Sequence, residues 1–197
     1  MKVSVLVSGG KDSVLALWIA LHQFEVTSIL TIRSFCPESH LFHIPNSQYV
    51  DLMAEILEIS HKIIRIDSCN IEDEINSLKD ALSSSSEKAI ITGGIRSEFQ
   101  RYKFNRAAKL ANKRCFNPLW RISPKILLSE LLTNKFRVII TSVSSMGLSK
   151  ELLGREFSPK VLETLKQSGP ELSLVGEGGE FETFVLDAPF FPASIKI

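Results

Sequence analysis

The 197-residue sequence has few cysteines, no excess of either charge and no long hydrophobic run. Cys36, Cys69 and Cys115 form no C-x-x-C pair, which argues against a disulfide scaffold and against a zinc site of that kind. Lys and Arg number 23 against 22 Asp and Glu, so no global charge attracts nucleic acid or an anionic membrane. No stretch approaches the roughly 18 apolar residues of a membrane span. We therefore expect a cytoplasmic protein with no membrane partner.

Short runs of Val and Ile alternate along the chain with longer stretches whose apolar residues recur at helical spacing. A strand over residues 3–7 is followed by such a helical pattern over 14–21. The β-branched runs at 89–91 and 138–140 are typical of parallel strands that are covered on both faces. The sequence thus predicts an α/β fold, with a doubly wound, mostly parallel, Rossmann-like sheet up to about residue 143.

The length favours one domain or one domain with a small appendage, against a prior of roughly 150 residues per domain. We expect the sheet to occupy residues 1–145. Residues 146–197 are expected to form a C-terminal subregion packed on it, because the tail changes to one helix near Leu162 and then to a segment rich in Gly, Glu and Phe.

A loop suited to phosphate lies between the first predicted strand and the first predicted helix. It consists of Ser8, Gly9, Gly10, Lys11, Asp12 and Ser13. Two glycines permit positive φ, so successive N–H groups can line one concavity at a helix N-terminus, where phosphate binds. Lys11 adds a charge, and Asp12 can hold Mg²⁺ carried on pyrophosphate oxygens. The alternative is an ordinary turn, in which Asp12 or Ser13 caps the helix.

Other phosphate loops do not fit this sequence. The Walker pattern requires glycine where the chain has Val5, and the dinucleotide pattern G-x-G-x-x-G is missing. The sequence S-G-G-K-D-S resembles the PP-loop of the N-type ATP pyrophosphatases. That resemblance implies cleavage of ATP to AMP and pyrophosphate while an acceptor oxygen is adenylated, with the loop holding the pyrophosphate.

Four further stretches narrow the resemblance: residues 43–46, 93–101, 118–120 and 176–183. With the loop and residues 147–155, they resemble the diphthine-ammonia ligases from residue 3 to about residue 191. The resemblance implies amidation of the diphthine carboxylate on translation elongation factor 2 with ammonium, through an acyl-adenylate. ATP and Mg²⁺ are the implied cofactors. A tRNA-modifying ligase of the same superfamily and a non-catalytic ATP-binding module are the alternatives. We do not expect RNA as a partner. Both a monomer and a homo-oligomer are compatible with the sequence.

The resemblance also assigns residues to the site. The ATP-binding set is the loop together with Gly93 and Gly94. The substrate-binding set is His43, Asn46, Trp120, Glu177, Glu180, Phe181 and Glu182. We expect Lys11, Arg101 and Glu180 to be catalytic. The chain departs from the family pattern at Lys103 and Asn105, where an arginine and an acidic residue are common.

The expectation for Arg101 also follows from its neighbours. Ser97 and Gln100 form an S-x-x-Q capping box, which predicts that a helix begins there. Phe104 and Ala108 follow Arg101 at helical spacing, so Arg101 is expected to face the core near the carboxyl end of the sheet. A cation there is placed to meet phosphate or an oxyanion. The alternative is a buried ion pair with a glutamate.

Residues 96–114 contain seven basic residues and one acid, Glu98. Arg106, Lys109 and Lys113 share one predicted helical face with Tyr102. A solvated face is the simplest interpretation, and docking of an acidic protein surface is the main alternative.

A possible zinc site has the spacing C-x3-H-x2-H and consists of Cys36, His40 and His43. A zinc site is disfavoured because no fourth ligand is nearby.

The acidic and aromatic residues near the C-terminus suggest a site for a cation. Alternation places Glu180 and Glu182 on one face of an extended strand, where they can hold Mg²⁺ or neutralise a cationic substrate. Trimethylammonium groups bind over aromatic faces. We therefore expect Trp120, with at least one of Phe181 and Phe184 and with Glu180 or Glu182, to surround the diphthine cation beside the ATP site. The alternative is that these aromatic residues belong to the core.

Overall fold

The computed structural model describes residues 1–34, 46–145, 148–168 and 173–196. Its main sheet is parallel, with the strand order β3-β2-β1-β4-β5. These strands are β1 (Lys2–Leu6), β2 (Glu25–Ser34), β3 (Ser60–Ile66), β4 (Ala89–Ile91) and β5 (Arg114–Phe116). The sequence prediction of a doubly wound α/β fold is confirmed.

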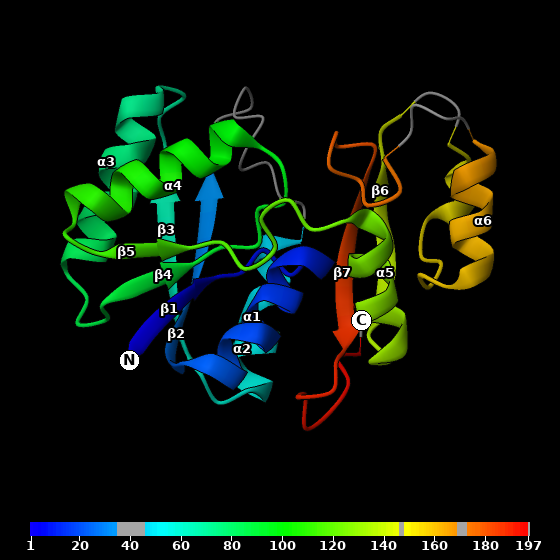
Figure 1. Cartoon of the computed structure of the whole chain (residues 1–197), viewed down its shortest axis with the longest axis horizontal. Helices are drawn as coiled ribbons and strands as arrows, with labels where there is room; N and C mark the ends of the chain where they lie inside the picture. The colour runs from blue at the N-terminus through cyan, green and yellow to red at the C-terminus, as the bar shows by residue number, and fades with distance from the viewer. Residues whose placement is uncertain (35–45, 146–147, 169–172, 197) are drawn as a thin grey trace.

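Helices cover both faces of this sheet (Figure 1). The helices on one face are α1 (Lys11–Gln23) and α2 (Val50–Ile56), and those on the other are α3 (Ile71–Ser83) and α4 (Glu98–Leu110). Val5 of β1 joins the first hydrophobic cluster and Leu6 joins the second. Successive side chains of a strand point to opposite faces, so the short strands are buried on both sides.

A second, two-stranded sheet lies beside α1 (Figure 1). In it β6 (Arg137–Val143) pairs antiparallel with β7 (Phe181–Asp187). The expectation that residues 138–140 join the parallel sheet is therefore wrong. A β-branched run indicates a buried strand, but it does not indicate which other strand will pair with it. The division at residue 145 stays a prediction, although the β6–β7 pairing crosses it.

The remaining elements connect or cover these two sheets. They are the short helices η1 (Ser47–Tyr49) and η2 (Lys150–Leu152) and the helices α5 (Pro124–Thr133) and α6 (Pro159–Gln167). No helix within the described residues is long and apolar enough to cross a membrane. Cys115 is a free thiol.

Candidate active site

The candidate site lies where the strand order of the parallel sheet reverses. From β1 the chain continues to β2 and β3 on one side, whereas β4 and β5 lie on the other. In open α/β sheets, ligands bind beyond the carboxyl ends of the strands at such a point. The loops after β1 and β4 meet there: a Cβ on Gly93 would lie 2.8 Å from the backbone carbonyl of Asp12. A glycine is therefore needed where the β4 loop approaches α1.

Gly9 and Gly10 have different roles in the loop after β1. Gly9 has φ +86°, and a Cβ there would lie 2.6 Å from the Phe184 ring. Gly10 has φ −73° and precedes α1, so only one of the two glycines uses the left-handed region. The loop is closed by the Ser13 hydroxyl, which donates to the Gly10 carbonyl at 2.9 Å and accepts from the Ser8 N–H at 3.1 Å. Because α1 begins at Lys11 with Gly10 as its N-cap, neither Asp12 nor Ser13 caps the helix, and phosphate binding by the loop stays a prediction.

Lys11 links this loop to the C-terminal part of the chain. Its side chain is buried, with an exposed fraction of 3%. The ammonium group donates to Asp12 Oδ2 at 3.0 Å and to the carbonyl of Val175. Its backbone N–H donates to the Thr183 hydroxyl on β7 at 3.2 Å. Lys11 thus connects the phosphate loop to the second sheet and to Val175, which directly precedes residues 176–183, the glutamate-rich stretch.

Three carboxyl groups share the electrostatic environment of Lys11. Burial raises the pKa of Asp12, although the Lys11 ammonium opposes this effect. Burial also raises the pKa of Glu177 and of Glu182, and the nearby Asp12 charge adds to both increases. Arg96, in the loop after β4, lies 3.8 Å from Glu177 between Nε and Oε2. Residues from three separate segments therefore form one acidic region around a buried cation.

The residues present fit a magnesium ion at Asp12. Asp12 Oδ1 is buried, and no hydrogen-bond partner for it is found within the described part of the chain. Mg²⁺ is usually held by one or two carboxylates together with substrate phosphate oxygens. Such an ion would neutralise phosphate charge at the loop. No group of three metal-binding side chains occurs among the described residues, so phosphate oxygens and water would complete its coordination.

Glu180 differs from the expectation based on strand alternation. β7 begins at Phe181, so Glu180 precedes the strand and does not share a strand face with Glu182. Its two carboxylate oxygens accept from the backbone N–H groups of Ser173 at 3.1 Å and Gly178 at 2.8 Å. The Glu180 carboxylate therefore shapes the loop that contains Val175 and Glu177. Its expected catalytic role stays a prediction.

The two residues expected at the substrate-side surface can be only partly placed. Asn46 is buried, and its amide donates to the Thr141 hydroxyl at 2.6 Å and the Thr183 carbonyl at 3.2 Å. Asn46 thus joins β6 to β7 beside the phosphate loop, and substrate binding by it stays a prediction. His43 lies outside the described residues, as do Cys36 and His40.

The helix start with Ser97 as its N-cap is confirmed, but the orientation expected for Arg101 is wrong. The Ser97 hydroxyl accepts from the Gln100 N–H at 3.2 Å. The Arg101 side chain is 44% exposed and pairs with Glu98 at 3.3 Å, so it does not face the core. The buried residues of α4 are Lys103, Ala107 and Ala108. A charged residue occupies the buried face because Lys103 forms an ion pair with Glu74 of α3.

The expected aromatic cage is not formed by the residues chosen for it. Phe181 and Phe184 are 2% and 0% exposed, so they belong to the core and offer no open face to a substrate cation. Trp120 is half-buried, and its ring already has the guanidinium of Arg101 at 4.6 Å and that of Arg121 at 5.9 Å. The alternative of core phenylalanines is correct.

Three residues with prominent contacts at the site were not predicted from the sequence. Thr183 and Arg96 lie within stretches that carry the family resemblance, so their position in those stretches was an available signal. The Val175 carbonyl carried no such signal, because a backbone acceptor is not visible in side-chain patterns.

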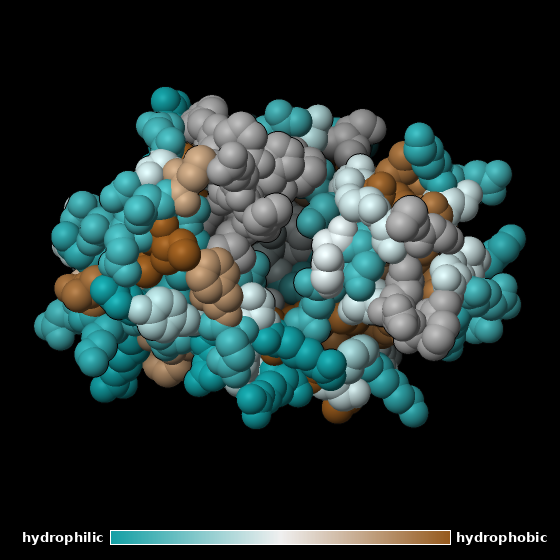
Figure 2. Space-filling view, turned by 90° about the horizontal axis from the view of Figure 1, so that it is seen from above, coloured by the Kyte–Doolittle hydropathy of each residue, from teal (hydrophilic) through white to brown (hydrophobic). Residues whose placement is uncertain are grey.

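Seen from above, the described surface consists mostly of hydrophilic residues, with hydrophobic patches among them (Figure 2).

The doubly wound sheet, with a glycine-containing loop at its switch point, has the architecture of α/β proteins that bind a ligand at that point. The diphthamide synthase N-terminal domain matches residues 1–112, and the diphthamide synthase C-terminal domain matches residues 123–197. The chain therefore belongs to the diphthamide synthase family.

Individual relatives are similar over the whole chain. A diphthine–ammonia ligase of Bos taurus is 30% identical, over 100% of this chain and 83% of that protein. The Homo sapiens protein of the same name is 29% identical with the same coverage. The Saccharomyces cerevisiae protein is 27% identical over 97% of this chain and 33% of its own length.

Two solved structures are similar at lower identity. One is a predicted subunit of a tRNA methyltransferase from Methanocaldococcus jannaschii, with TM-score 0.48 and 20% identity, covering 79% of this chain and 93% of that one. The other is a 4-thiouridine synthetase in complex with RNA and ATP, with TM-score 0.43 and 16% identity, covering 94% of this chain and 55% of that one.

Proposed function

We propose that this chain amidates the carboxylate of diphthine on translation elongation factor 2, with ATP and ammonium, and releases AMP and pyrophosphate. The observation that carries the proposal is the phosphate loop at the switch point, with Lys11 buried between the loop and the glutamate-rich stretch. Membership of the diphthamide synthase family supports the acceptor. We also propose a cytoplasmic location, because the protein substrate is a translation factor.

The loop residues act mainly by positioning and by stabilising charge. The diphthine carboxylate attacks the α-phosphorus of ATP and pyrophosphate leaves. The N–H groups of Asp12 and Ser13, which have no intrahelical acceptor, and the Lys11 ammonium would hold the leaving pyrophosphate. Ammonia then attacks the acyl carbon, and AMP leaves. Asp12 would hold Mg²⁺, which supplies charge neutralisation at the phosphates.

Residues outside the loop would orient the acceptor. Glu177 and Glu182 bring negative charge beside Lys11, which suits the trimethylammonium group of diphthine. Glu180 would act indirectly, since its carboxylate holds the loop that carries Glu177. Arg101 is exposed beside Trp120, so we place it at the rim of the site and not on the phosphates.

Incubation with diphthine-bearing elongation factor, ATP and ammonium tests this function. The factor should lose the mass difference between a carboxylic acid and its amide, and nucleotide analysis should find AMP and pyrophosphate. Lys11→Ala and Asp12→Ala should remain folded and lose most turnover, whereas Lys125→Ala, at an exposed site on α5, should behave as the wild type. Formation of ADP, or near-normal turnover by Lys11→Ala, would contradict the proposal.

A further inference from the structure

Helix α4 exposes a stripe of large apolar side chains. Phe99, Tyr102 and Leu110 are 46%, 50% and 55% exposed and lie on one side of the helix, because they are separated by three and eight residues. We call these three residues the α4 stripe; it is about 16 Å long at 1.5 Å per residue. Clustered exposed apolar side chains with charged neighbours are typical of protein interaction sites.

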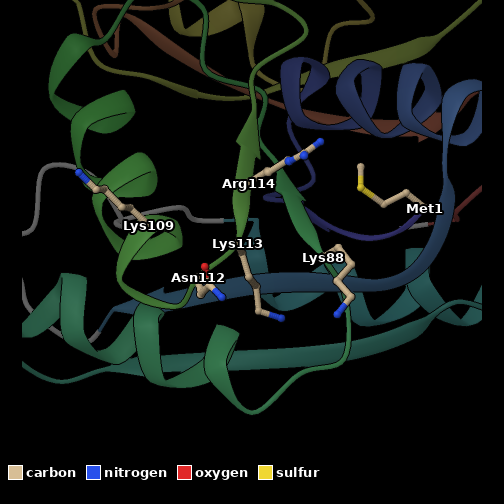
Figure 3. Close-up of a pocket in the computed structure, with 6 residues that line it drawn as sticks. All are labelled: Met1, Lys88, Lys109, Asn112, Lys113 and Arg114. Carbon is tan, nitrogen blue, oxygen red and sulfur yellow. The ribbon is translucent and has the colours of Figure 1, made fainter.

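Basic groups flank the α4 stripe. Arg106 lies between Tyr102 and Leu110; it donates to the Tyr102 hydroxyl at 2.6 Å and pairs with Glu72 at 3.0 Å. Lys109, next to Leu110, lines a hollow of about 480 Å³ at the amino ends of β1, β4 and β5 (Figure 3). The other residues that line this hollow are Met1, Lys88, Asn112, Lys113 and Arg114.

No carboxylate lines this hollow within the described residues. Lys113 is fixed in it, since its ammonium donates to the Ser85 carbonyl at 2.8 Å and the Glu87 carbonyl at 2.5 Å. Lys88, Lys109 and Arg114 are exposed and offer their charges to the solvent. The stripe therefore ends in a basic surface, which favours an acidic partner.

We propose that the α4 stripe and the basic hollow dock the elongation factor through a surface segment that carries acidic residues around apolar ones. This inference rests on the proposed function, since it names how the same protein substrate is held. The active site would contact only the modified residue of that substrate, whereas a specific protein complex buries about 800 Å² on each partner. α4 begins at Glu98, directly after the loop that contains Gly93 and Gly94, so the stripe leads away from the edge of the active site.

Replacing the apolar stripe gives the first test. The triple variant Phe99→Ser, Tyr102→Ser and Leu110→Ser should raise KM for diphthine-bearing factor at least about tenfold, which is the effect of losing a few interface anchors. Its kcat and its KM for ATP should stay within about twofold of the wild type. The matched control is Ile126→Ser with Leu153→Ser, which changes side chains of similar exposure on other surfaces.

Charge reversal gives the second test and does not depend on the stability of the triple variant. Lys109→Glu with Arg114→Glu should weaken factor binding and reduce its dependence on salt, because surface charges mainly steer association. Lys125→Glu with Lys160→Glu, at exposed sites on α5 and α6, is the control. Both pairs should unfold in urea at the wild-type midpoint.

The outcomes separate docking from other roles. An unchanged KM for the factor, or equal increases for factor and ATP, overturns the proposal. The proposal is also overturned if the triple variant loses RNA binding or self-association while its KM for the factor is unchanged. Calorimetry with the Lys11→Ala variant measures binding of the factor directly, without catalytic turnover. If the wild type fails to amidate a factor that binds through the stripe, the proposed function fails and docking stands.

Discussion

Replacing Gly9 by alanine tests the geometry of the phosphate loop. At φ +86° an L-residue costs about 1 to 2 kcal/mol relative to the right-handed region. The new Cβ would also lie 2.6 Å from Cε2 and 2.8 Å from Cδ2 of Phe184. Phe184 is fully buried, so its ring has no space to move into, and such overpacking costs about 1 to 3 kcal/mol. We expect a net destabilisation of about 3 kcal/mol, after the reduced entropy of the unfolded chain is included.

Two glycines provide matched controls for the two parts of this estimate. Gly154 has φ +72°, and apart from Gly154 and its two chain neighbours no described atom lies within 4 Å of the position that a Cβ would take there. Gly154→Ala therefore introduces backbone strain alone and should cost about 1 kcal/mol. Gly10 has φ −73°, and its Cβ would make only ordinary contacts of 3.5 Å or more. Gly10 is the N-cap of α1, where alanine is less favourable than glycine, so Gly10→Ala should lose about 0.5 to 1 kcal/mol without any overpacking of a ring.

Equilibrium unfolding in urea measures all three variants. With a slope of about 2 kcal/mol per molar, Gly9→Ala should lower the midpoint by about 1.5 M. A loss no larger than that of Gly154→Ala would show that the Phe184 contact does not constrain the loop. Wild-type stability of Gly9→Ala would refute the left-handed conformation itself. Gly10→Ala should also raise KM for ATP if the loop binds phosphate as proposed, because the added methyl lies within the loop, 3.5 Å from the Ser8 hydroxyl.

Two further predictions concern ionisable groups. Hydrogen bonds from its own backbone and from hydroxyls of β2 outweigh burial and lower the pKa of Glu87 from 4.5 to about 2. Its ionised form therefore stabilises the fold by about 3 kcal/mol above pH 4.5, and this is lost as the pH falls towards 2. Glu87→Gln should flatten acid unfolding in this range, whereas Glu25→Gln should not. Burial raises the pKa of Glu177 and Arg96 lowers it. Arg96→Gln should therefore shift the acid limb of the kcat/KM profile to higher pH; an identical shift in Arg65→Gln would contradict this.

The parallel sheet and the phosphate loop were predictable because their signals are local. The strand over residues 3–7, the two glycines and Lys11 are contiguous, and a glycine-rich turn before a helix has few other uses. The partner of β6 was not predictable in this way. Residues 138–140 report burial, but β7 lies about forty residues further along, and no local pattern links the two strands.

The errors on α4 and in the C-terminal stretch have different origins. Arg101 was assigned to the core from its spacing to Phe104 and Ala108, but the buried face of α4 contains Lys103 with its partner Glu74. Tertiary pairing decided that face, and a single sequence does not report it. Phe181 and Phe184 belong to the core, as large apolar residues usually do, and the expectation of a cage departed from this tendency.

The charges around Lys11 explain why the phosphate loop needs the C-terminal part of the chain. Asp12, Glu177 and Glu182 share this region, and burial raises the pKa of each, so the region resists further negative charge. A polyphosphate adds such charge, and the α1 N-terminus offers only about half an elementary charge in return. Under the proposed function, a divalent cation at Asp12 would offset the phosphates, and Glu177 and Glu182 would be left to attract a cationic acceptor. Lys11 contacts both Asp12 of the loop and the Val175 carbonyl, so the proposal places nucleotide and acceptor on either side of this residue.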